Sequence, residues 1–463
     1  MNETLSSCCL PADAPFHSYE DVMRHLDSLG LFHMDMGLGR MERALEKCGI
    51  TRFHCPAVQV VGTNGKGSTS SFLQSLAMAH GISTALYTSP HFVFPEERIR
   101  LDRTMLPRRV WPRLAGNAVL AQPGLTYFEL LTVMAADAFQ DSDCGLMIFE
   151  AGLGGRYDAT STLPVDMVCF VPIDLDHTAV LGSTVQAIAD DKSDALRPGV
   201  CMAVSAPQPR EARAVLEAKA DARGIPLCSA PSPFSCAGTD AGQALWSSLP
   251  SHLRELAVLP EDAELGLRGP HQRMNAQTAL LAWILLCHQY GWKTDRAAIA
   301  RGLAEAFIPG RLQYAPARGE RPALWLDGAH NPHGMTALLS ALADAKAMPE
   351  ALRPGAVIFS CLGDKEPEQM AALLAQASAL LGNVPVFVPP IADNPRAAAP
   401  AELAALLRQA REGQTAAPAE SMEHALSSAR HAAGTKPILV CGSLYLVSEI
   451  FALWPELLSP AQD

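Results

Sequence analysis

A short apolar run that leads into a glycine-rich turn with one lysine constrains this chain more than any other segment. Val58–Val61 is rich in β-branched residues, and a helix-compatible stretch follows the turn as far as His80. Glycines let backbone N–H groups curl around phosphate oxygens, and the start of the following helix adds the positive end of its dipole. The order of strand, turn and helix therefore predicts a phosphate loop that binds ATP, rather than a plain Gly/Ser turn. Its members are Gly62, Thr63, Asn64, Gly65, Lys66, Gly67 and Ser68.

Two side chains of this loop add chemistry to that of the backbone. Lys66 places a full positive charge beside the phosphates, and the Ser68 hydroxyl is suited to hold a magnesium ion. Gly67 separates the two residues, whereas the usual nucleotide loop has the hydroxyl directly after the lysine.

Short apolar runs alternate with helical stretches over most of the chain, which is typical of parallel α/β architecture. The runs in the first two-thirds are nearly continuous, as expected where helices cover both faces of a sheet. We therefore predict a doubly wound nucleotide-binding domain, with a loop-rich stretch from Pro207 to about Leu265. Its strands are expected at Ala57–Val61, Thr84–Thr88, Leu146–Phe149, Met167–Ile173 and Val200–Val204.

Polar residues follow four of these strands. The phosphate loop follows the first, Ser89 the second, Glu150 the third, and Asp174, Asp176 and His177 the fourth. Ligands of doubly wound sheets bind at the carboxyl ends of the strands, so we expect one assembled site. A carboxylate and a neutral imidazole can share a divalent ion, which makes Glu150 and His177 candidate magnesium ligands.

A second series of strands and helices begins after Gly310 and predicts a smaller, Rossmann-like α/β domain. We expect a first domain over residues 1–306, a linker over 307–310 and a second domain over 311–463. Asp327 and His330 follow a predicted strand, where they either face one ligand or form a plain turn before a helix. The strands are expected at Ala323–Leu326, Val357–Ser360, Val384–Val388 and Ile438–Val440, and the helices at Met335–Ala345, Pro367–Leu381, Ala401–Arg411 and Leu444–Trp454.

Composition restricts the class of protein. A length of 463 residues favours two domains, and a net charge of −12 argues against a general binder of nucleic acid or membrane surfaces. The 12 cysteines are scattered, with only Cys8 and Cys9 close together and no zinc-like spacing, so we expect reduced thiols. The N-terminal segment lacks the pattern of a signal peptide, and no apolar run is long enough for a membrane span. We expect a cytoplasmic protein.

Two charged segments can be interpreted either as ordinary solvated surface or as functional sites. Lys192 stands beside Asp190 and Asp191, which is typical of a surface helix residue. A basic cluster is either a solvated loop or a landing site for a polyanion. It contains Arg98, Arg100, Arg103, Arg108, Arg109 and Arg113, against only Asp102.

Together these motifs resemble the folylpolyglutamate synthase/dihydrofolate synthase family of the Mur-ligase-like superfamily, over nearly the whole chain. The phosphate loop with its additional Gly67 resembles the loop of this family, and further motifs follow in family order. They are Asp35–Arg40, Thr88–His91 with Glu97–Ile99, Thr126–Glu129, Glu150–Thr160, Leu175–His177, His271–Gln272 with Asn275, Pro309–Arg311, Asp327–Pro332 and Gly442–Tyr445.

The resemblance implies roles for single residues. Lys66, His177, Lys192, Asp327 and His330 would act in catalysis. Lys192 would do so by carrying a carbamate that helps hold the second of two magnesium ions. This chain has Ser193-Asp194-Ala195 after Lys192, where the family usually has Ala-Gly-Ile, and Ser161 where Asn is common. The implied metal ligands are Ser68, Ser89, Glu150 and His177; the implied contacts to ATP or glutamate across the domain cleft are Asn275, Arg311, Asp327 and His330; the implied folate side comprises Arg98, Tyr127, Phe128 and Asp158.

The resemblance also implies a reaction. ATP would activate the carboxylate of dihydropteroate or of a folyl-glutamate as an acyl phosphate, and L-glutamate would capture it. The partners would be small molecules, with no nucleic acid or membrane, and the chain would be a monomer. Two alternatives stay open: a Mur-type ligase of cell-wall synthesis, which usually has the hydroxyl directly after the loop lysine, and a nucleotide-dependent switch without ligase activity.

Overall fold

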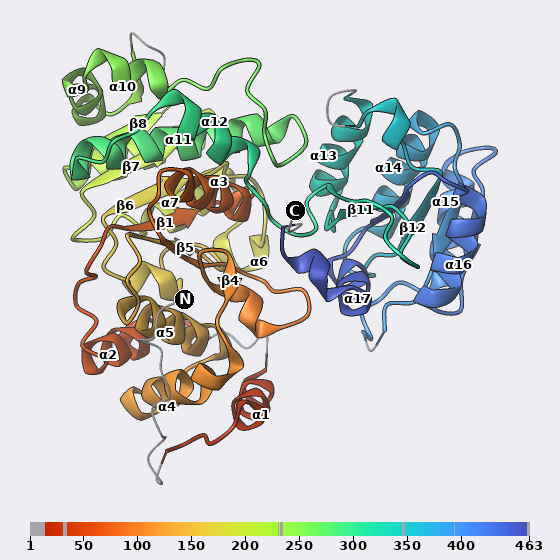
Figure 1. Cartoon of the computed structure of the whole chain (residues 1–463), viewed down its shortest axis with the longest axis horizontal. Coiled ribbons are helices and arrows are strands. Elements are labelled where there is room, and N and C mark those ends of the chain that lie inside the picture. Colours follow the sequence, from red (N-terminus) through yellow and green to blue (C-terminus); the bar gives the residue numbers. More distant parts are fainter. Residues whose placement is uncertain are drawn as a thin grey trace. The chain divides into compact units, whose positions relative to one another are not determined.

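Two sheets organise the part of the chain that the computed structural model describes (Figure 1). Contacts between backbone positions divide it into two compact units. The first runs to Glu264 and includes Met274–Ala306, while the second comprises Leu265–Arg273 and the chain from Phe307 onward. The expected division placed residues 265–273 in the first domain, whereas here they pack with the second unit. The described residues are 14–30, 35–229, 231, 235–344, 348–392 and 394–460.

The first unit contains a nine-stranded sheet in the order β4-β3-β2-β5-β1-β6-β7-β8-β9. The six strands from β2 to β8 in this order are parallel, and β3, β4 and β9 extend its edges in antiparallel pairs. The mostly parallel α/β fold class is therefore confirmed. The strands are β1 (Ala57–Val61), β2 (Thr84–Tyr87), β3 (Ile99–Leu101), β4 (Thr104–Met105), β5 (Leu146–Glu150), β6 (Met167–Phe170), β7 (Met202–Ser205), β8 (Leu227–Ser229) and β9 (Ala237–Gly238).

Helices cover both faces of this sheet, which explains why its central strands are apolar throughout (Figure 1). Met147 and Phe149 of β5 share one core with Leu130 and Met134 of α5, while α3 packs against β1, β2 and β5. The helices are α1 (Tyr19–Leu29), α2 (Gly39–Lys47), α3 (Lys66–Ala79), α4 (Trp111–Ala121), α5 (Tyr127–Gln140), α6 (Thr178–Leu181), α7 (Val185–Ser193), α8 (Arg210–Ala222), α9 (Asp240–Ser248), α10 (Ser251–Leu256), α11 (His271–Tyr290) and α12 (Arg296–Ala304).

The second unit contains a six-stranded sheet in the order β10-β11-β15-β12-β13-β14, parallel except for β10. Its core joins Trp325 of β11 and Phe359 of β12 to Leu374 of α14 and Leu403 of α15. The elements are β10 (Gln313–Ala315), β11 (Leu324–Asp327), α13 (Pro332–Ala343), β12 (Ala356–Phe359), α14 (Pro367–Leu380), β13 (Val386–Val388), α15 (Pro400–Ala410), β14 (Ala416–Pro418), α16 (Met422–Ala433), β15 (Ile438–Cys441) and α17 (Leu444–Leu453).

The stretch from Pro207 to Leu265 differs from its prediction. It was expected to be rich in loops, but it contains α8, α9 and α10 together with the edge strands β8 and β9. The run Ala230-Pro231-Ser232-Pro233 had suggested loops, and of it only Pro231 is among the described residues. The expected N-terminal features, Cys8 and Cys9 included, lie outside the described residues. None of the described helices is long and apolar enough to cross a membrane.

Candidate active site

Four neighbouring parallel strands bring the predicted polar residues to one edge of the first sheet. In the order β2-β5-β1-β6, each strand pairs in parallel with the next, so their carboxyl ends lie side by side. Ser89 follows β2, Glu150 is the last residue of β5, Gly62 follows β1 and the segment 171–177 follows β6. The edge at which ligands bind in doubly wound sheets therefore carries all four clusters.

The phosphate loop is held by backbone contacts to the segment after β6. The Thr63 amide donates to the Pro172 carbonyl (2.9 Å), and the Thr63 hydroxyl donates to the Asp174 carbonyl (3.1 Å). Gly62 has φ +154°, and a Cβ there would lie 2.3 Å from a methyl carbon of Val171. This close approach of two backbones requires glycine, which explains the first glycine of the motif.

The lysine of the loop folds back onto the loop's own backbone. Gly65 precedes α3 with a left-handed φ of +92°, which turns the chain into the helix. The Lys66 ammonium donates to the carbonyls of Gly62 (3.1 Å) and Thr63 (3.0 Å). Asn275 of α11 is buried against the loop, because a Cβ on Gly65 would lie 2.4 Å from its Oδ1. The structure thus brings Asn275 to the loop across more than two hundred residues.

Oxygen donors gather beside the loop. The Ser89 amide donates to Oε2 of Glu150 (3.2 Å), which ties the ends of β2 and β5 together. Ser68 is buried at the start of α3. Carboxylate and hydroxyl oxygens are the ligands that Mg²⁺ prefers, so the chemistry of these donors fits this ion. His177 stands before α6 with φ +48°; its side chain is half-exposed, and its Nε2 lies 3.7 Å from the Asp176 carboxylate.

Lys192 is buried, and the expectation of a surface position was wrong. Its side chain on α7 turns inward and donates to the Gly62 carbonyl (3.0 Å). Burial, with a smaller contribution from the positive charge of Lys66, lowers the pKa of Lys192 to about 7. The acidic residues that suggested exposure point elsewhere, since Asp190 pairs with Arg156 (2.6 Å). An amine that is about half uncharged at neutral pH therefore lies against the phosphate loop.

The glycines after β5 permit this burial. A Cβ on Gly155 would lie 2.5 Å from the Lys192 carbonyl oxygen, and the Gly155 amide donates to Asp191 (2.9 Å). Asp194, where the family usually has glycine, forms ion pairs with Arg156 (2.6 Å) and Lys219 (2.8 Å). The departure from the family pattern is thus matched by local partners on the outer side of α7.

The predicted folate-side residues cluster beyond β2 and at the start of α5. Nε of Arg98 donates to Nδ1 of His91 (2.9 Å), and the Arg98 guanidinium stands 5.5 Å from the centre of the Tyr127 ring. Burial and the neighbouring Arg98 charge lower the pKa of His91 to about 3, so His91 is a neutral acceptor. Phe128 packs tightly on Gly152, where a Cβ would lie 2.6 Å from the ring.

Asp158 has a structural task in this region. Its buried carboxylate accepts hydrogen bonds from the backbone amides of Leu153 (2.7 Å) and Thr160 (2.9 Å), which fixes the loop after β5. Burial raises the pKa of this carboxyl, and the hydrogen bonds oppose that shift. A direct contact of Asp158 with folate stays a prediction.

Several arginines of the basic cluster contact different residues of the first unit. Arg108 pairs with Glu96 (2.7 Å) and stacks on Tyr19, and Arg113 pairs with Asp141 (2.8 Å). Arg103 donates to the Ser75 hydroxyl (2.7 Å). Arg109 is exposed. Arg103, Arg108 and Arg113 thus each have a partner within the chain, and binding of a polyanion by this cluster stays a prediction.

Arg311, Asp327 and His330 come together within the second unit, at the carboxyl end of β11. The Asp327 carboxylate accepts from the amides of Leu312 (2.8 Å) and Ala329 (2.9 Å). Burial raises the pKa of Asp327, and the positive charge of Arg311 opposes the shift. Nδ1 of His330 bonds to the Gly328 carbonyl (2.8 Å), and a Cβ on Gly328 would approach Leu444 to 2.5 Å. The predicted turn before a helix is also present, because Asn331 caps α13.

Comparisons with known proteins agree with this arrangement. Residues 310–444 match the family described as Mur ligase, glutamate ligase domain. The chain is 30% identical over 434 residues to the dihydrofolate synthase/folylpolyglutamate synthase of Escherichia coli K12, covering 92% of this chain and 93% of the relative. The chain belongs to this family.

Solved structures show the same fold. Escherichia coli FolC in complex with DHPP and ADP matches with a TM-score of 0.74 and 27% identity, over 95% of this chain and 98% of that chain. A bifunctional folylpolyglutamate synthase/dihydrofolate synthase with Mn, AMPPNP and L-glutamate bound matches with a TM-score of 0.72 and 25% identity, over 96% and 99%. As a member of this family, the chain is an ATP-dependent ligase.

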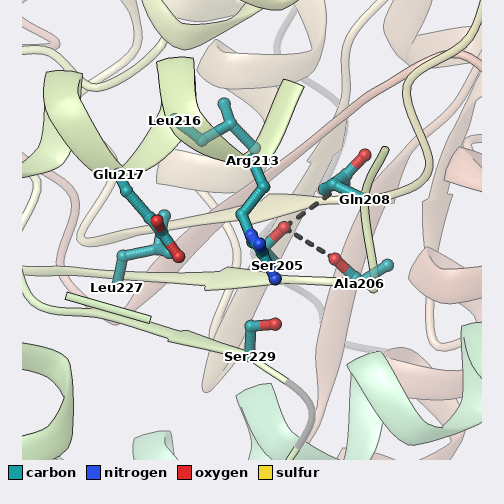
Figure 2. Close-up of a pocket in the computed structure, with 8 residues that line it drawn as sticks. All are labelled: Ser205, Ala206, Gln208, Arg213, Leu216, Glu217, Leu227 and Ser229. Carbon is teal, nitrogen blue, oxygen red and sulfur yellow. Dashed lines mark hydrogen bonds between the residues drawn. The ribbon is translucent and has the colours of Figure 1, made fainter. Parts of the chain in front are cut away.

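Sequence reasoning missed a residue that positions the site of this family member. Gln208 lies after β7 in a small pocket with Ser205, Arg213 and Ser229 (Figure 2). Its amide nitrogen donates to the Val171 carbonyl (3.0 Å), and its oxygen accepts from the Ile173 amide (3.0 Å). Gln208 thus fixes the segment after β6 that holds the phosphate loop. No local pattern marks such a residue, because its partners in this segment lie 35 and 37 positions away.

Proposed function

We propose that this chain joins the amino group of L-glutamate to the carboxyl group of dihydropteroate and of folyl-glutamates, using ATP. The observation that carries the proposal is the convergence of the phosphate loop, Ser89, Glu150 and the buried Lys192 behind one sheet edge. The second unit, with its match to a glutamate ligase domain, supports glutamate as the second substrate.

The chemistry explains the need for ATP. A carboxylate is a poor electrophile towards an amine, because oxide is a poor leaving group. A carboxylate oxygen of the acid attacks the γ-phosphorus of ATP, and the bond to ADP breaks. The amine of glutamate then attacks the carbonyl carbon of the acyl phosphate, loses a proton and expels inorganic phosphate. Both steps gain chiefly from positioning and from neutralised phosphate charge.

Residues of the first unit would perform the phosphoryl step. Gly62–Gly67 would cradle the phosphates with backbone amides, and Lys66 would exchange its two carbonyl partners for phosphate oxygens. Ser68, Ser89, Glu150 and His177 would hold magnesium, which when bound neutralises negative charge on the phosphates. Asn275 would fix the shape of the loop through its contact with Gly65.

Lys192 is proposed to carry a carbamate. An amine reacts with CO₂ only when it is unprotonated, and burial lowers the pKa of Lys192 to about 7, so a large share is reactive at neutral pH. The carbamate would add a negative charge beside Lys66 and the metal ligands. The Lys192 amine is within hydrogen-bonding distance of the loop itself, at 3.0 Å from the Gly62 carbonyl.

The remaining roles follow from the two smaller clusters. Arg98, Tyr127 and Phe128 would bind the folate side of the acid, with the aromatic rings suited to a flat heterocycle. Asp158 would shape this surface and contact the acid. Arg311, Asp327 and His330 would bind ATP or glutamate from the second unit. We further propose that the enzyme acts as a monomer in the cytoplasm, where the ten described cysteines, none of which forms a disulfide here, would stay reduced.

A coupled assay of ADP release tests the proposed function. Dihydropteroate and then tetrahydrofolate serve as the acid, each with and without glutamate. ADP release that requires both acid and glutamate supports the proposal, and hydroxylamine should trap the acyl phosphate as a hydroxamate. Turnover with a UDP-sugar peptide instead would identify a Mur-type ligase, and ATP hydrolysis that ignores both substrates would identify a nucleotide switch.

A further inference from the structure

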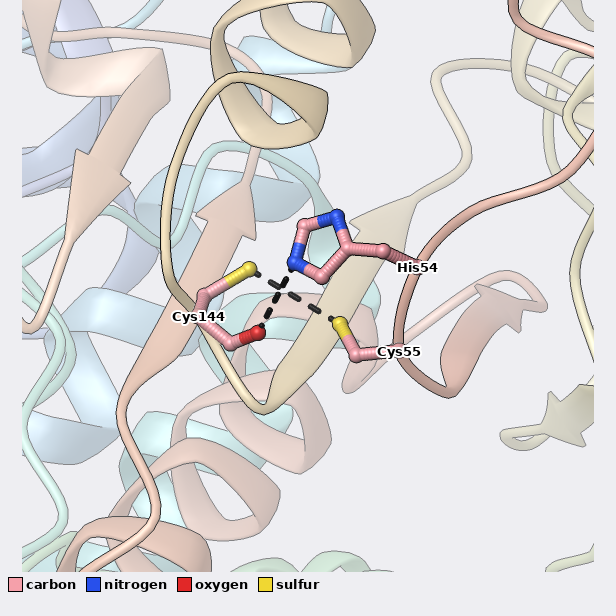
Figure 3. A group of neighbouring side chains, drawn as sticks. All are labelled: His54, Cys55 and Cys144. Atoms are coloured by element: carbon pink, nitrogen blue, oxygen red, sulfur yellow. Dashed lines mark hydrogen bonds between the residues drawn. The ribbon is translucent and has the colours of Figure 1, made fainter. Parts of the chain in front are cut away.

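A cluster of side chains that ligate soft metal ions lies at the amino ends of the strands of the first sheet, opposite the ends that carry the phosphate loop. His54 and Cys55 precede β1, and Cys144 precedes β5, its parallel neighbour (Figure 3). One ligand atom from each residue lies within 4.8 Å of the others. The phosphate loop follows the far end of β1, about 16 Å away for a strand of this length. This cluster is therefore separate from the site described above.

The two sulfur atoms have the spacing of a metal-thiolate pair. They lie 3.8 Å apart, too far for a disulfide bond of about 2.05 Å. Two thiolates that share a tetrahedral zinc ion at about 2.3 Å lie about 3.8 Å from each other. The imidazole of His54 lies beside them, and its Nε2 donates a hydrogen bond to the Cys144 carbonyl oxygen (3.1 Å), a bond that Nε2 would exchange for the metal. The sulfur pair thus has the spacing that zinc requires, and a ring nitrogen of His54 lies within 4.8 Å of both sulfurs.

The exposure of the three side chains also favours a metal ion at this site. Cys144 is buried, Cys55 is half-buried and His54 is exposed, so an ion can enter from solvent and a water molecule can complete the tetrahedron. Thiolate is the form that binds metals, so both thiol protons must leave when the ion binds.

We propose that His54, Cys55 and Cys144 form a binding site for a soft divalent transition metal such as Zn²⁺. Binding would release the thiol protons to solvent and join the amino ends of β1 and β5, two central strands of the sheet. Soft sulfur ligands select such ions over Mg²⁺, so the site would not compete with the nucleotide for its metal.

Cobalt titration tests this site, because Co²⁺ replaces Zn²⁺ and gives a thiolate-to-metal charge-transfer band. The full chain, reduced and freed of metal, is titrated anaerobically in excess Mg²⁺. We expect one equivalent bound with this band, displacement by Zn²⁺ and a higher melting temperature with Zn²⁺. Cys144→Ser and Cys55→Ser should lose the band, and His54→Gln should weaken binding by about tenfold or more. Cys201→Ser, at an exposed cysteine of the same unit, should bind as the wild type does.

Three outcomes would overturn the proposal. The first is the absence of the charge-transfer band in the reduced wild-type chain. The second is unchanged binding in Cys55→Ser and His54→Gln, whose partly exposed positions make them the deciding variants if Cys144→Ser fails to fold. The third is a mass lower by two hydrogens that maps to a Cys55–Cys144 disulfide after purification under reducing conditions, which would identify a redox pair instead.

Discussion

Three glycines of the site are required because neighbouring groups leave no room for a side chain. Gly62, Gly65 and Gly155 each stand where a Cβ would lie 2.5 Å or less from another group, and these groups are Val171, Asn275 and Lys192. Lys192 is buried because Gly155 lets its backbone approach. The shape of the site thus requires glycine at these three positions.

Substitution of Gly65 by alanine should separate backbone strain from loss of the loop. Both Gly65 (φ +92°) and Gly81 (φ +77°) are left-handed, which costs alanine roughly 1–2 kcal/mol. Only at Gly65 would the new Cβ collide with Asn275. We expect Gly65→Ala to lower stability more than Gly81→Ala and to weaken ATP-analogue binding by about tenfold, a difference of roughly 1.4 kcal/mol. Calorimetric binding and thermal unfolding of both variants measure this; equal nucleotide affinity would contradict it.

Burial of Lys192 should make stability depend on pH. Its pKa is lowered from 10.5 to about 7 in the folded chain, so between these values the unfolded chain binds more protons. Stability therefore rises with pH through this interval, and the contribution is lost as pH falls towards 7. In CO₂-free buffer, urea unfolding of the wild type should gain stability from pH 6.5 to 9 relative to Lys192→Met. If the unfolding free energies of the wild type and of Lys192→Met change with pH in the same way, the Lys192 amine is not desolvated.

At the scale of elements, one ion pair links two motifs of the family. Glu129 accepts from the Thr126 amide (2.8 Å) and so caps α5, which begins with Tyr127 and Phe128. Arg40 of α2 donates to both Glu129 oxygens (3.2 and 3.0 Å) and to Asp35 (2.7 Å). The arginine therefore fixes the start of the helix that carries the proposed folate side.

Removal of Arg40 should affect the acid substrate more than ATP. Arg40→Gln leaves the largely buried Glu129 without its charge partner, which should cost about 1–3 kcal/mol. We expect a higher KM for dihydropteroate, with the KM for ATP unchanged. Arg113→Gln is the matched control, because its pair with Asp141 is partly exposed and should contribute less than about 1 kcal/mol. The prediction fails if the two variants have the same KM for dihydropteroate.

At the scale of the molecule, we propose that the first unit binds the phosphates of ATP and the acid, and that the second unit binds glutamate. Each has its own sheet and core, and each presents its predicted site residues at the carboxyl ends of parallel strands. The second unit lacks a phosphate loop in the residues that the structure describes, so nucleotide binding should depend on the first.

Nucleotide binding should therefore stabilise the chain through Lys66. At a concentration of AMPPNP and Mg²⁺ about a hundred times Kd, linkage predicts a gain of about 2.7 kcal/mol in the wild type. Lys66→Ala should show little of this gain and little turnover. Lys219→Ala, an outer lysine that pairs with Asp194, should keep both. Differential scanning fluorimetry with and without nucleotide measures the effect, and an equal rise in melting temperature for Lys66→Ala would contradict it.

The sequence determined the elements and the phosphate loop, because both follow from local patterns. Buried parallel strands are apolar throughout, and glycines at 62 and 65 mark the turn that phosphate requires, so β1, β5 and α3 were predictable within a residue or two. The tertiary structure decided the strand order that aligns Ser89 and Glu150 with the loop, the burial of Lys192 and the meeting of Cys55 with Cys144. These contacts join residues 61 to 130 positions apart, where free energy of packing, rather than local preference, selects the partner.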